Sequence, residues 1–414
     1  SDVYKRQTVN YIKKTKKAIL WINIFNQPLA SLYVLLAVIL RKDLHISAFQ
    51  IALLTTLKPV VSILSFYWSS WVKNHPVNLR FNLILAGIGL RIPFLLFPFI
   101  SNVWFYIFSS ALYMLLYRTI NPIWIEVLKR NLSKQNRDRY YSIGSSISFG
   151  VSIPLAIIFG KILGISWLRW QWIFFGSALI GLVGLFFQIL LPIQNSECMV
   201  NNRTNVSWKS FLILPLINSF RLMKERKDFA RFQWIFMLGG VGLMLLQSIY
   251  PIYIVDILHL SYMDTTIAVL ICNGLGFCFS TTYWARALNR YPIYFVISLV
   301  CGLLALHMIS MLCAISFPFA FYLAHLIYGV ANAGSHLSWN LSGAIFARSE
   351  NSIQFSSVNI VMVGVRGLIA PALGSYLCMK FGTPYVFCLG MILCVIGTIY
   401  AHSLVERKKT FRIQ

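Results

Sequence analysis

The chain has 414 residues, of which 58% are hydrophobic and only 11% are charged, and its formal net charge is +25. Soluble domains carry about 25% charged residues, so this composition excludes a soluble fold and predicts a chain that uses lipid as its solvent. The cations lie mostly between apolar runs and no nucleic-acid-binding motif is present, so we expect no nucleic-acid partner.

A helix that spans a bilayer needs about 20 mostly apolar residues. The sequence contains twelve such runs, at 18–40, 47–72, 79–100, 103–128, 140–163, 167–191, 232–256, 263–286, 292–314, 319–347, 355–378 and 384–403. We therefore expect an all-α membrane protein built of two six-helix bundles. Its expected parts are an N-terminal tail at 1–17, a bundle at 18–191, a central loop at 192–231, a bundle at 232–403 and a tail at 404–414.

Lysine and arginine are distributed unevenly between the two sides that these runs define. If the N-terminus is cytoplasmic, 27 of the 36 lysines and arginines fall in cytoplasmic segments and five on the opposite side. Cytoplasmic loops of membrane proteins are enriched in these residues. The pattern predicts a multi-pass protein of the bacterial inner membrane with both termini in the cytoplasm.

The two halves of the sequence show traces of an internal repeat. A shift of 216 residues brings Tyr67-Trp68 onto Tyr283-Trp284 and Pro76 onto Pro292. A shift of 217 brings Gly150-x-x-x-Pro154 onto Gly367-x-x-x-Pro371, each in the fifth run of its half. Because these matches occur at nearly the same offset and in equivalent runs, they predict two parallel six-helix repeats. We assign a gating or helix-packing role to Gly150, Pro154, Gly367 and Pro371.

Together, these features resemble the major facilitator superfamily over the whole chain: six and six spans, termini inside, a long basic central loop and the repeat. The resemblance implies a secondary transporter that works by alternating access, with a central site formed by the first, fourth, seventh and tenth spans and helped by the second and eleventh. The family's loop signature is altered, because Trp68-Ser-Ser-Trp-Val-Lys73-Asn-His75-Pro76-Val-Asn-Leu-Arg80 keeps basic residues but lacks the aspartate and both glycines. Arg118-Thr-Ile-Asn121-Pro122 matches a signature of proton-coupled members at the arginine.

Charged residues inside the spans are candidates for function, because a charge in mid-bilayer costs from about 3 to more than 10 kcal/mol. Lys58, Arg118 and Arg366 are assigned to a substrate site, and Glu126 to proton coupling. Arg91, which precedes Pro93, is expected instead to bond helix-end carbonyl groups. Asp256 and Asp264 are expected as caps at the membrane interface.

Polar side chains in the first, seventh and tenth runs complete the predicted substrate site. Amides can hydrogen-bond a polar solute, and an imidazole can also relay protons because its pKa lies near neutrality. His336 is therefore a candidate for both roles. The predicted binding residues in these runs are Asn26, Gln27, Gln247, Asn332, His336, Trp339 and Asn340. The alternative reading is that the amides join helices to one another.

The four mid-span cations outnumber the one acid, and such a cavity should attract anions. We therefore expect transport of an organic anion or a phosphorylated metabolite, accompanied by a proton or exchanged for another anion. Efflux of amphipathic drugs or lipids is the alternative, followed by a non-transporting sensor on the same fold and a membrane enzyme acting on lipid. No catalytic motif or P-loop is present, so we expect no enzyme activity and no cofactor. We also expect the protein to be a monomer.

The spacing of the cysteines predicts no metal site. Seven of the eight cysteines lie in apolar runs and no pair has the spacing of a zinc site. They are expected to pack as small apolar side chains. Residues 1–17 are basic and are expected to contain no signal peptide.

Overall fold

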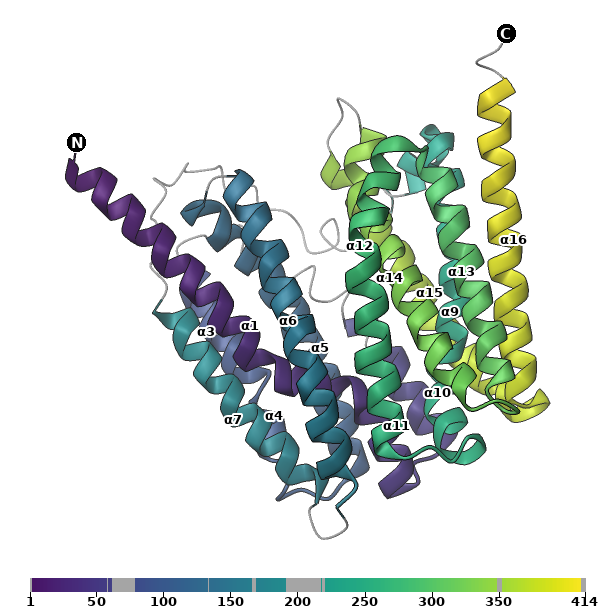
Figure 1. Ribbon diagram of the computed structural model, residues 1–414, viewed down its shortest axis with the longest axis horizontal. Coiled ribbons are helices and arrows are strands. Elements are labelled where there is room, and N and C mark those ends of the chain that lie inside the picture. The colour runs from purple at the N-terminus through teal and green to yellow at the C-terminus, as the bar shows by residue number, and fades with distance from the viewer. Residues whose placement is uncertain are drawn as a thin grey trace. The chain divides into compact units, whose positions relative to one another are not determined.

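The computed structural model describes residues 2–57, 59–61, 79–132, 134–165, 169–190, 217, 220–347 and 352–410. All regular secondary structure in these residues is helical (Figure 1). The helices of the N-terminal half are α1 (Asp2–Leu44), α3 (Leu79–Gly89), α4 (Ile92–Leu95), α5 (Val103–Asn131), α6 (Lys134–Leu163) and α7 (Trp170–Ile189). Those of the C-terminal half are α9 (Lys227–Gln247), α10 (Tyr250–Ile252), η2 (Tyr253–Ile257), α11 (Tyr262–Thr266), η3 (Ile267–Cys272), α12 (Asn273–Arg290), α13 (Ile293–Cys313), α14 (Phe319–Ala347), α15 (Ser352–Phe381) and α16 (Thr383–Thr410).

The helices agree with the apolar runs predicted from sequence. Among the described residues, eight helices are long and apolar enough to cross a membrane. Three shorter apolar helices, at 48–61, 81–95 and 147–163, account for the second, third and fifth runs. The remaining run at 319–347 coincides with the 29 residues of α14. The chain is thus an all-helical, multi-pass membrane protein.

Three predicted spans differ from continuous helices in the structure. The third run divides into α3 and α4 before Pro93, because proline lacks the N–H that a continuous helix needs. In the seventh run, α9 begins at Lys227, five residues earlier than the apolar pattern indicated, and ends at Gln247. The short helix α10 and the π-helix η2 complete that run, and a second π-helix, η3, interrupts the eighth.

The chain divides into two compact units, each made mainly of one half of the sequence. One unit contains residues 1–45, 61–203 and 261–266, and the other contains 46–60, 204–260 and 267–414. Each unit therefore also includes a short segment of a helix from the other half of the sequence. In the first unit α1 packs against α6 and α7, and α11 packs against α6. In the second, α12 packs against α14, and α16 packs against α13 and α9.

The turns that follow the first and seventh spans repeat one another in sequence and in backbone geometry. Leu44-His45-Ile46-Ser47 matches Leu258-His259-Leu260-Ser261. His45 and His259 are the two described residues other than glycine with positive φ, at 48° and 49°. Each turn ends in a serine whose hydroxyl accepts the N–H of the residue three positions later, as in a capping box. This match between the two turns supports the internal duplication. The shifts of 216 and 217 residues did not reveal it, because the two turns are separated by a slightly smaller shift.

Glycines bring two helices of the second unit together at their backbones. A Cβ atom at Gly276 would lie 3.2 Å from the Cα of Gly329 and 3.1 Å from the backbone nitrogen of Val330. One at Gly329 would lie 3.0 Å from the backbone nitrogen of Phe277. Small residues allow this close crossing of membrane helices, so the backbones of α12 and α14 contact each other at these glycines.

Candidate functional site

A buried arginine joins three helices of the first unit. Arg91 is 3% exposed and donates to the carbonyl oxygen of Gly87 and to Oδ1 of Asn26 in α1. Gly181 of α7 leaves room for the guanidinium, since a Cβ atom there would lie 2.7 Å from Nε of Arg91. The prediction that Arg91 bonds a helix-end carbonyl is confirmed. Asn26, predicted as a substrate ligand, uses its oxygen to hold this cation.

Arg118 has a different environment, although it lies in the same unit. It is an exposed residue near the middle of α5, and it forms no hydrogen bond or ion pair with any described residue. Tyrosines surround this part of the helix: Tyr113 stacks on Tyr117 and packs against Tyr33, with ring centroids 5.7 and 4.2 Å apart. The Tyr33 hydroxyl lies 3.0 Å from the hydroxyl of Ser110. Arg118 is thus an exposed cation beside this group of tyrosines.

The structure describes the other predicted residues of this unit incompletely. Nε2 of Gln27 donates to the hydroxyl of Ser31 at 3.2 Å, one turn away on α1. Lys58 lies outside the described residues, as does the side chain of Glu126 in α5.

The second unit contains another buried arginine that is bound to the protein itself. Arg366 of α15 is 9% exposed and donates from Nη1 to the carbonyl oxygen of Phe236 at 2.8 Å. Its guanidinium carbon lies 4.4 Å from the centroid of the Phe236 ring, a distance suited to a cation–π contact. A side chain at Gly240 would clash with this guanidinium. The contacts place Arg366 between α15 and α9 and favour a packing role over the predicted ligand role.

An amide network connects three helices of the same unit near Trp339. Nε2 of Gln233 donates to Oδ1 of Asn359. The amide nitrogen of Asn359 donates to the hydroxyl of Ser342 at 2.8 Å and to the carbonyl oxygen of Trp339 at 3.2 Å. Oε1 of Gln233 and Nε1 of Trp339 are buried atoms without a hydrogen-bond partner among the described residues. The predicted residue Trp339 is thus part of a network that the sequence reasoning did not identify.

The remaining predicted residues of the second unit are more accessible. Gln247 at the end of α9 is exposed, and so is His336 in α14. The ring of His336 lies 6.1 Å from that of Phe277, in an edge-to-face arrangement. Asn332 is half-buried, and the side chain of Asn340 lies outside the described residues.

Tyr250 and His325 form a polar pair that sequence reasoning did not assign to the site. The Tyr250 hydroxyl contacts Nε2 of His325, and Nδ1 of His325 lies 2.8 Å from the carbonyl oxygen of Phe321. A second buried histidine, His307 of α13, lies with its ring 6.3 Å from that of His325. The two partners are 75 residues apart in sequence, and no motif connects them.

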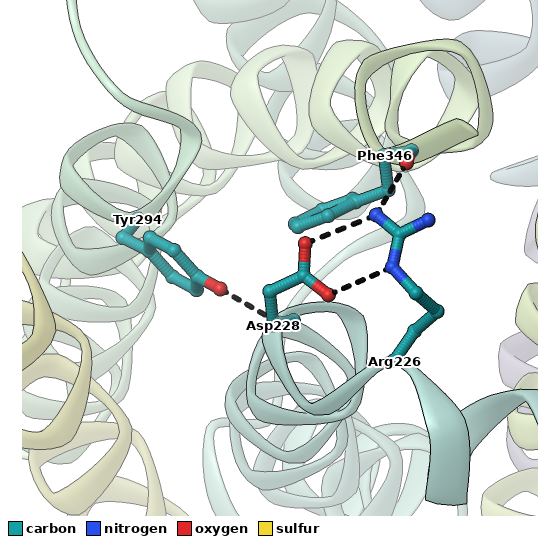
Figure 2. A network of polar contacts seen from close by, with 4 residues as sticks. All are labelled: Arg226, Asp228, Tyr294 and Phe346. Atoms are coloured by element: carbon teal, nitrogen blue, oxygen red, sulfur yellow. Dashed lines mark hydrogen bonds and ion pairs between the residues drawn. The ribbon is translucent and has the colours of Figure 1, made fainter. Parts of the chain in front are cut away.

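An ion pair fixes the start of α9 to two other helices of the second unit (Figure 2). Arg226 binds both carboxylate oxygens of Asp228, at 3.2 and 3.1 Å, and donates to the carbonyl oxygen of Phe346 at 2.8 Å. The Tyr294 hydroxyl donates to the backbone carbonyl of Asp228 at 2.6 Å. Phe346 is at the end of α14, where carbonyl groups lack helical partners and favour a cation.

The glycine–proline pairs of the repeat have unequal surroundings. A Cβ atom at Gly150 would meet no described atom within 4 Å, and Pro154 is exposed. Gly367 instead lies directly against Pro59. The carbonyl of Pro371 accepts the hydroxyl of Ser248 at 2.7 Å. The C-terminal pair therefore contacts neighbouring helices, and the described part of the chain contains no such contact for Gly150.

The ligating residues give no indication of a metal centre. Within the described ranges, no three histidine, cysteine, aspartate or glutamate side chains are close enough to hold a metal ion. The distinctive groups are instead one exposed intramembrane arginine, two buried arginines and hydrogen-bonded amides. The exposed arginine is the one suited to recognition of a polar solute, because the buried arginines and the amides already bond to neighbouring helices.

The comparisons with known proteins agree with this architecture. The family model of the Major Facilitator Superfamily matches residues 20–352, most of the chain, and the chain therefore belongs to that superfamily. It is a secondary transporter of a small solute and not an enzyme. No curated protein matches it in sequence.

Solved transporters share the fold over nearly their full length. A transporter of the POT family, solved with 5-aminolevulinic acid, has a TM-score of 0.72 at 11% identity, covering 95% of this chain and 96% of that one. The nucleoside transporter NupG has a TM-score of 0.69 at 14% identity, covering 94% and 97%. A D-xylose–proton symporter has a TM-score of 0.67 at 13% identity, also covering 94% and 97%. At these identities the likeness shows the fold alone.

Proposed function

We propose that the solute is an organic anion or a phosphorylated metabolite, bound by Arg118 and moved by alternating access. The observation that carries this proposal is the exposed guanidinium near the middle of α5. A charge placed there against lipid would cost several kcal/mol, on the order of 3 or more. The side chain is therefore expected to face a water-filled cavity, where it can hold a ligand.

The chemistry of arginine favours an anionic ligand at this position. Its planar group binds carboxylates and phosphates through paired donors. Arg91 and Arg366 already donate to acceptors of the protein, so they contribute less to such a site than Arg118. Lys58, Glu126 and Asn340 retain the roles predicted from sequence, as do the accessible residues Gln27, Gln247, Asn332 and His336.

The orientation and the location are also part of the proposal. We place both termini in the cytoplasm and the protein in a bacterial inner membrane, because of the basic residues in the loops. The solute moves together with a proton or in exchange for another anion. Two of the solved neighbours support the general idea of a polar solute, since their names give a nucleoside and a proton-coupled sugar as cargo.

Thermal unfolding of the purified protein tests the ligand class. The panel consists of citrate, glucose 6-phosphate, D-xylose and tetraphenylphosphonium, because a ligand that binds only the folded state raises its stability. We expect stabilisation by one of the two anions in the wild type and in Arg286→Gln, and its loss in Arg118→Gln. Arg286 is a suitable control because it is exposed and lies near the end of α12.

Two results would contradict the anion assignment. Equal anion binding by wild type and Arg118→Gln would remove Arg118 from the site. Stabilisation by tetraphenylphosphonium alone would instead favour efflux of amphipathic compounds.

A further inference from the structure

An exposed aromatic ring lies next to Arg118 at the centre of α5. Tyr117 directly precedes Arg118, far from both ends of the helix at Val103 and Asn131. Its surface is 43% exposed, and Arg118 is exposed as well. Tyrosines that contact lipid are enriched at the two membrane–water interfaces, where the hydroxyl can meet water. A tyrosine and an arginine that are both exposed in mid-span are therefore best explained by one water-filled cavity.

Two buried tyrosines support the ring of Tyr117. Tyr113, one turn earlier in α5, stacks on it with the ring planes 14° apart and the centroids 5.7 Å apart. Tyr33 of α1 is buried against Tyr113, and its hydroxyl is fixed by the hydroxyl of Ser110 at 3.0 Å. A ring that is already held in place loses little freedom when a ligand binds, so its contacts are expressed in the affinity.

The accessible surface of Tyr117 suits a second aromatic ring. Tyr113 is the one ring that stacks on it among the described residues, so the other face of Tyr117 is open to a ligand. Stacked aromatic rings gain energy beyond the area that they bury. A saturated ring of the same size lacks this gain.

Arg118 and Tyr117 contact different parts of a ligand that lies across them. Consecutive residues of a helix point in different directions, so a carboxylate on the guanidinium places the rest of the ligand beside the tyrosine. Arg91 and Arg366 are bonded to the protein, and within the described spans Arg118 is the arginine without such a bond. One guanidinium balances one negative charge and binds a carboxylate through paired donors.

We infer that the solute is an aromatic monocarboxylate, with its carboxylate on Arg118 and its ring stacked on Tyr117. The inference rests on the proposed transport of an organic anion and narrows its substrate class. Tyr117 is then a specificity-determining residue that selects the ring, whereas Arg118 selects the charge.

Benzoate and cyclohexanecarboxylate are matched probes, because each has one carboxylate on a six-carbon ring and only benzoate is aromatic. Thermal unfolding of the purified protein at increasing concentrations of each probe gives the two dissociation constants. We expect benzoate to bind the wild type about three- to tenfold more tightly, the range of one stacking contact. This comparison needs no variant, so it decides even if a substitution prevents folding.

Substitutions of Tyr117 assign the preference to its ring. Tyr117→Phe keeps a ring and should retain the preference for benzoate, whereas Tyr117→Leu should bring the ratio of the two dissociation constants to about one. Tyr283→Leu is the matched control, since Tyr283 of α12 is also an exposed tyrosine, and it should keep the wild-type ratio. Arg118→Gln should abolish binding of both probes.

Three results would overturn the inference. The first is equal affinity of the wild type for both probes, and the second is a preference for benzoate that persists in Tyr117→Leu. The third is stabilisation by citrate or glucose 6-phosphate but not by benzoate, which would leave the broader anion proposal standing. Stabilisation by none of the four anions would reject that proposal together with the inference.

Discussion

At the scale of single residues, the intramembrane arginines differ by what they bind. Arg91 and Arg366 are buried and donate to carbonyl groups of neighbouring helices, whereas Arg118 is exposed and has no bonded partner within the described ranges. A buried arginine whose hydrogen-bond acceptors belong to neighbouring helices joins those helices. Only the exposed one is suited to a ligand.

The role of Asn26 follows from its contact with Arg91 and can be tested by a double-mutant cycle. Asn26→Leu removes the acceptor and leaves a buried guanidinium short of a partner, so we expect a loss of about 2 kcal/mol of stability. Asn26→Leu combined with Arg91→Leu should recover part of that loss, because an apolar pair replaces an unsatisfied charge. Thermal unfolding, followed by tryptophan fluorescence, measures the change in stability of each variant. Losses that simply add would show that the two residues are not coupled.

At the scale of helices, the crossing of α12 and α14 depends on glycine at two facing positions. Gly329→Ala places a methyl group against the backbone of Asn273 and Phe277, which cannot rotate away as a side chain can. We expect a loss of about 1–3 kcal/mol in unfolding experiments.

Gly150→Ala is the matched control for this prediction. It is also a glycine within a helix, but no described atom lies within 4 Å of the added carbon. Alanine there should be neutral or stabilise the protein by up to about 1 kcal/mol through its helix propensity. Similar losses for both variants would contradict a specific role of the α12–α14 crossing.

At the scale of the whole molecule, the excess of lysine and arginine in one set of loops predicts the orientation. Alkaline phosphatase, which is active only outside the cytoplasm, should be inactive when fused after residue 410 or within 192–231. It should be active in the turn at 315–318, between α13 and α14. A green fluorescent protein fusion should give the opposite pattern. Phosphatase activity at the C-terminus would invert the proposed topology.

The repeat connects the element scale with the whole molecule. Sequence offsets predicted a duplication from glycine and proline pairs, but their packing is unequal, since Gly367 contacts Pro59 and Gly150 meets no described atom. The better evidence is the pair of turns at His45 and His259, which share a left-handed backbone and a capping box. Turn geometry is fixed by a few local residues, and therefore it survives where helix surfaces have diverged.

The sequence by itself determined the number and approximate position of the spans and the membership of the superfamily, because lipid imposes long apolar helices and the residues between them must be polar. It also identified Arg118 and Arg91 as unusual, since any charge inside a span is costly. Only the tertiary structure distinguished the buried arginines that join helices from the exposed one. It also showed that the seventh span is interrupted and that Tyr250 contacts His325. These features depend on which helices touch, and contacts between residues far apart in sequence leave no local pattern of spacing or periodicity.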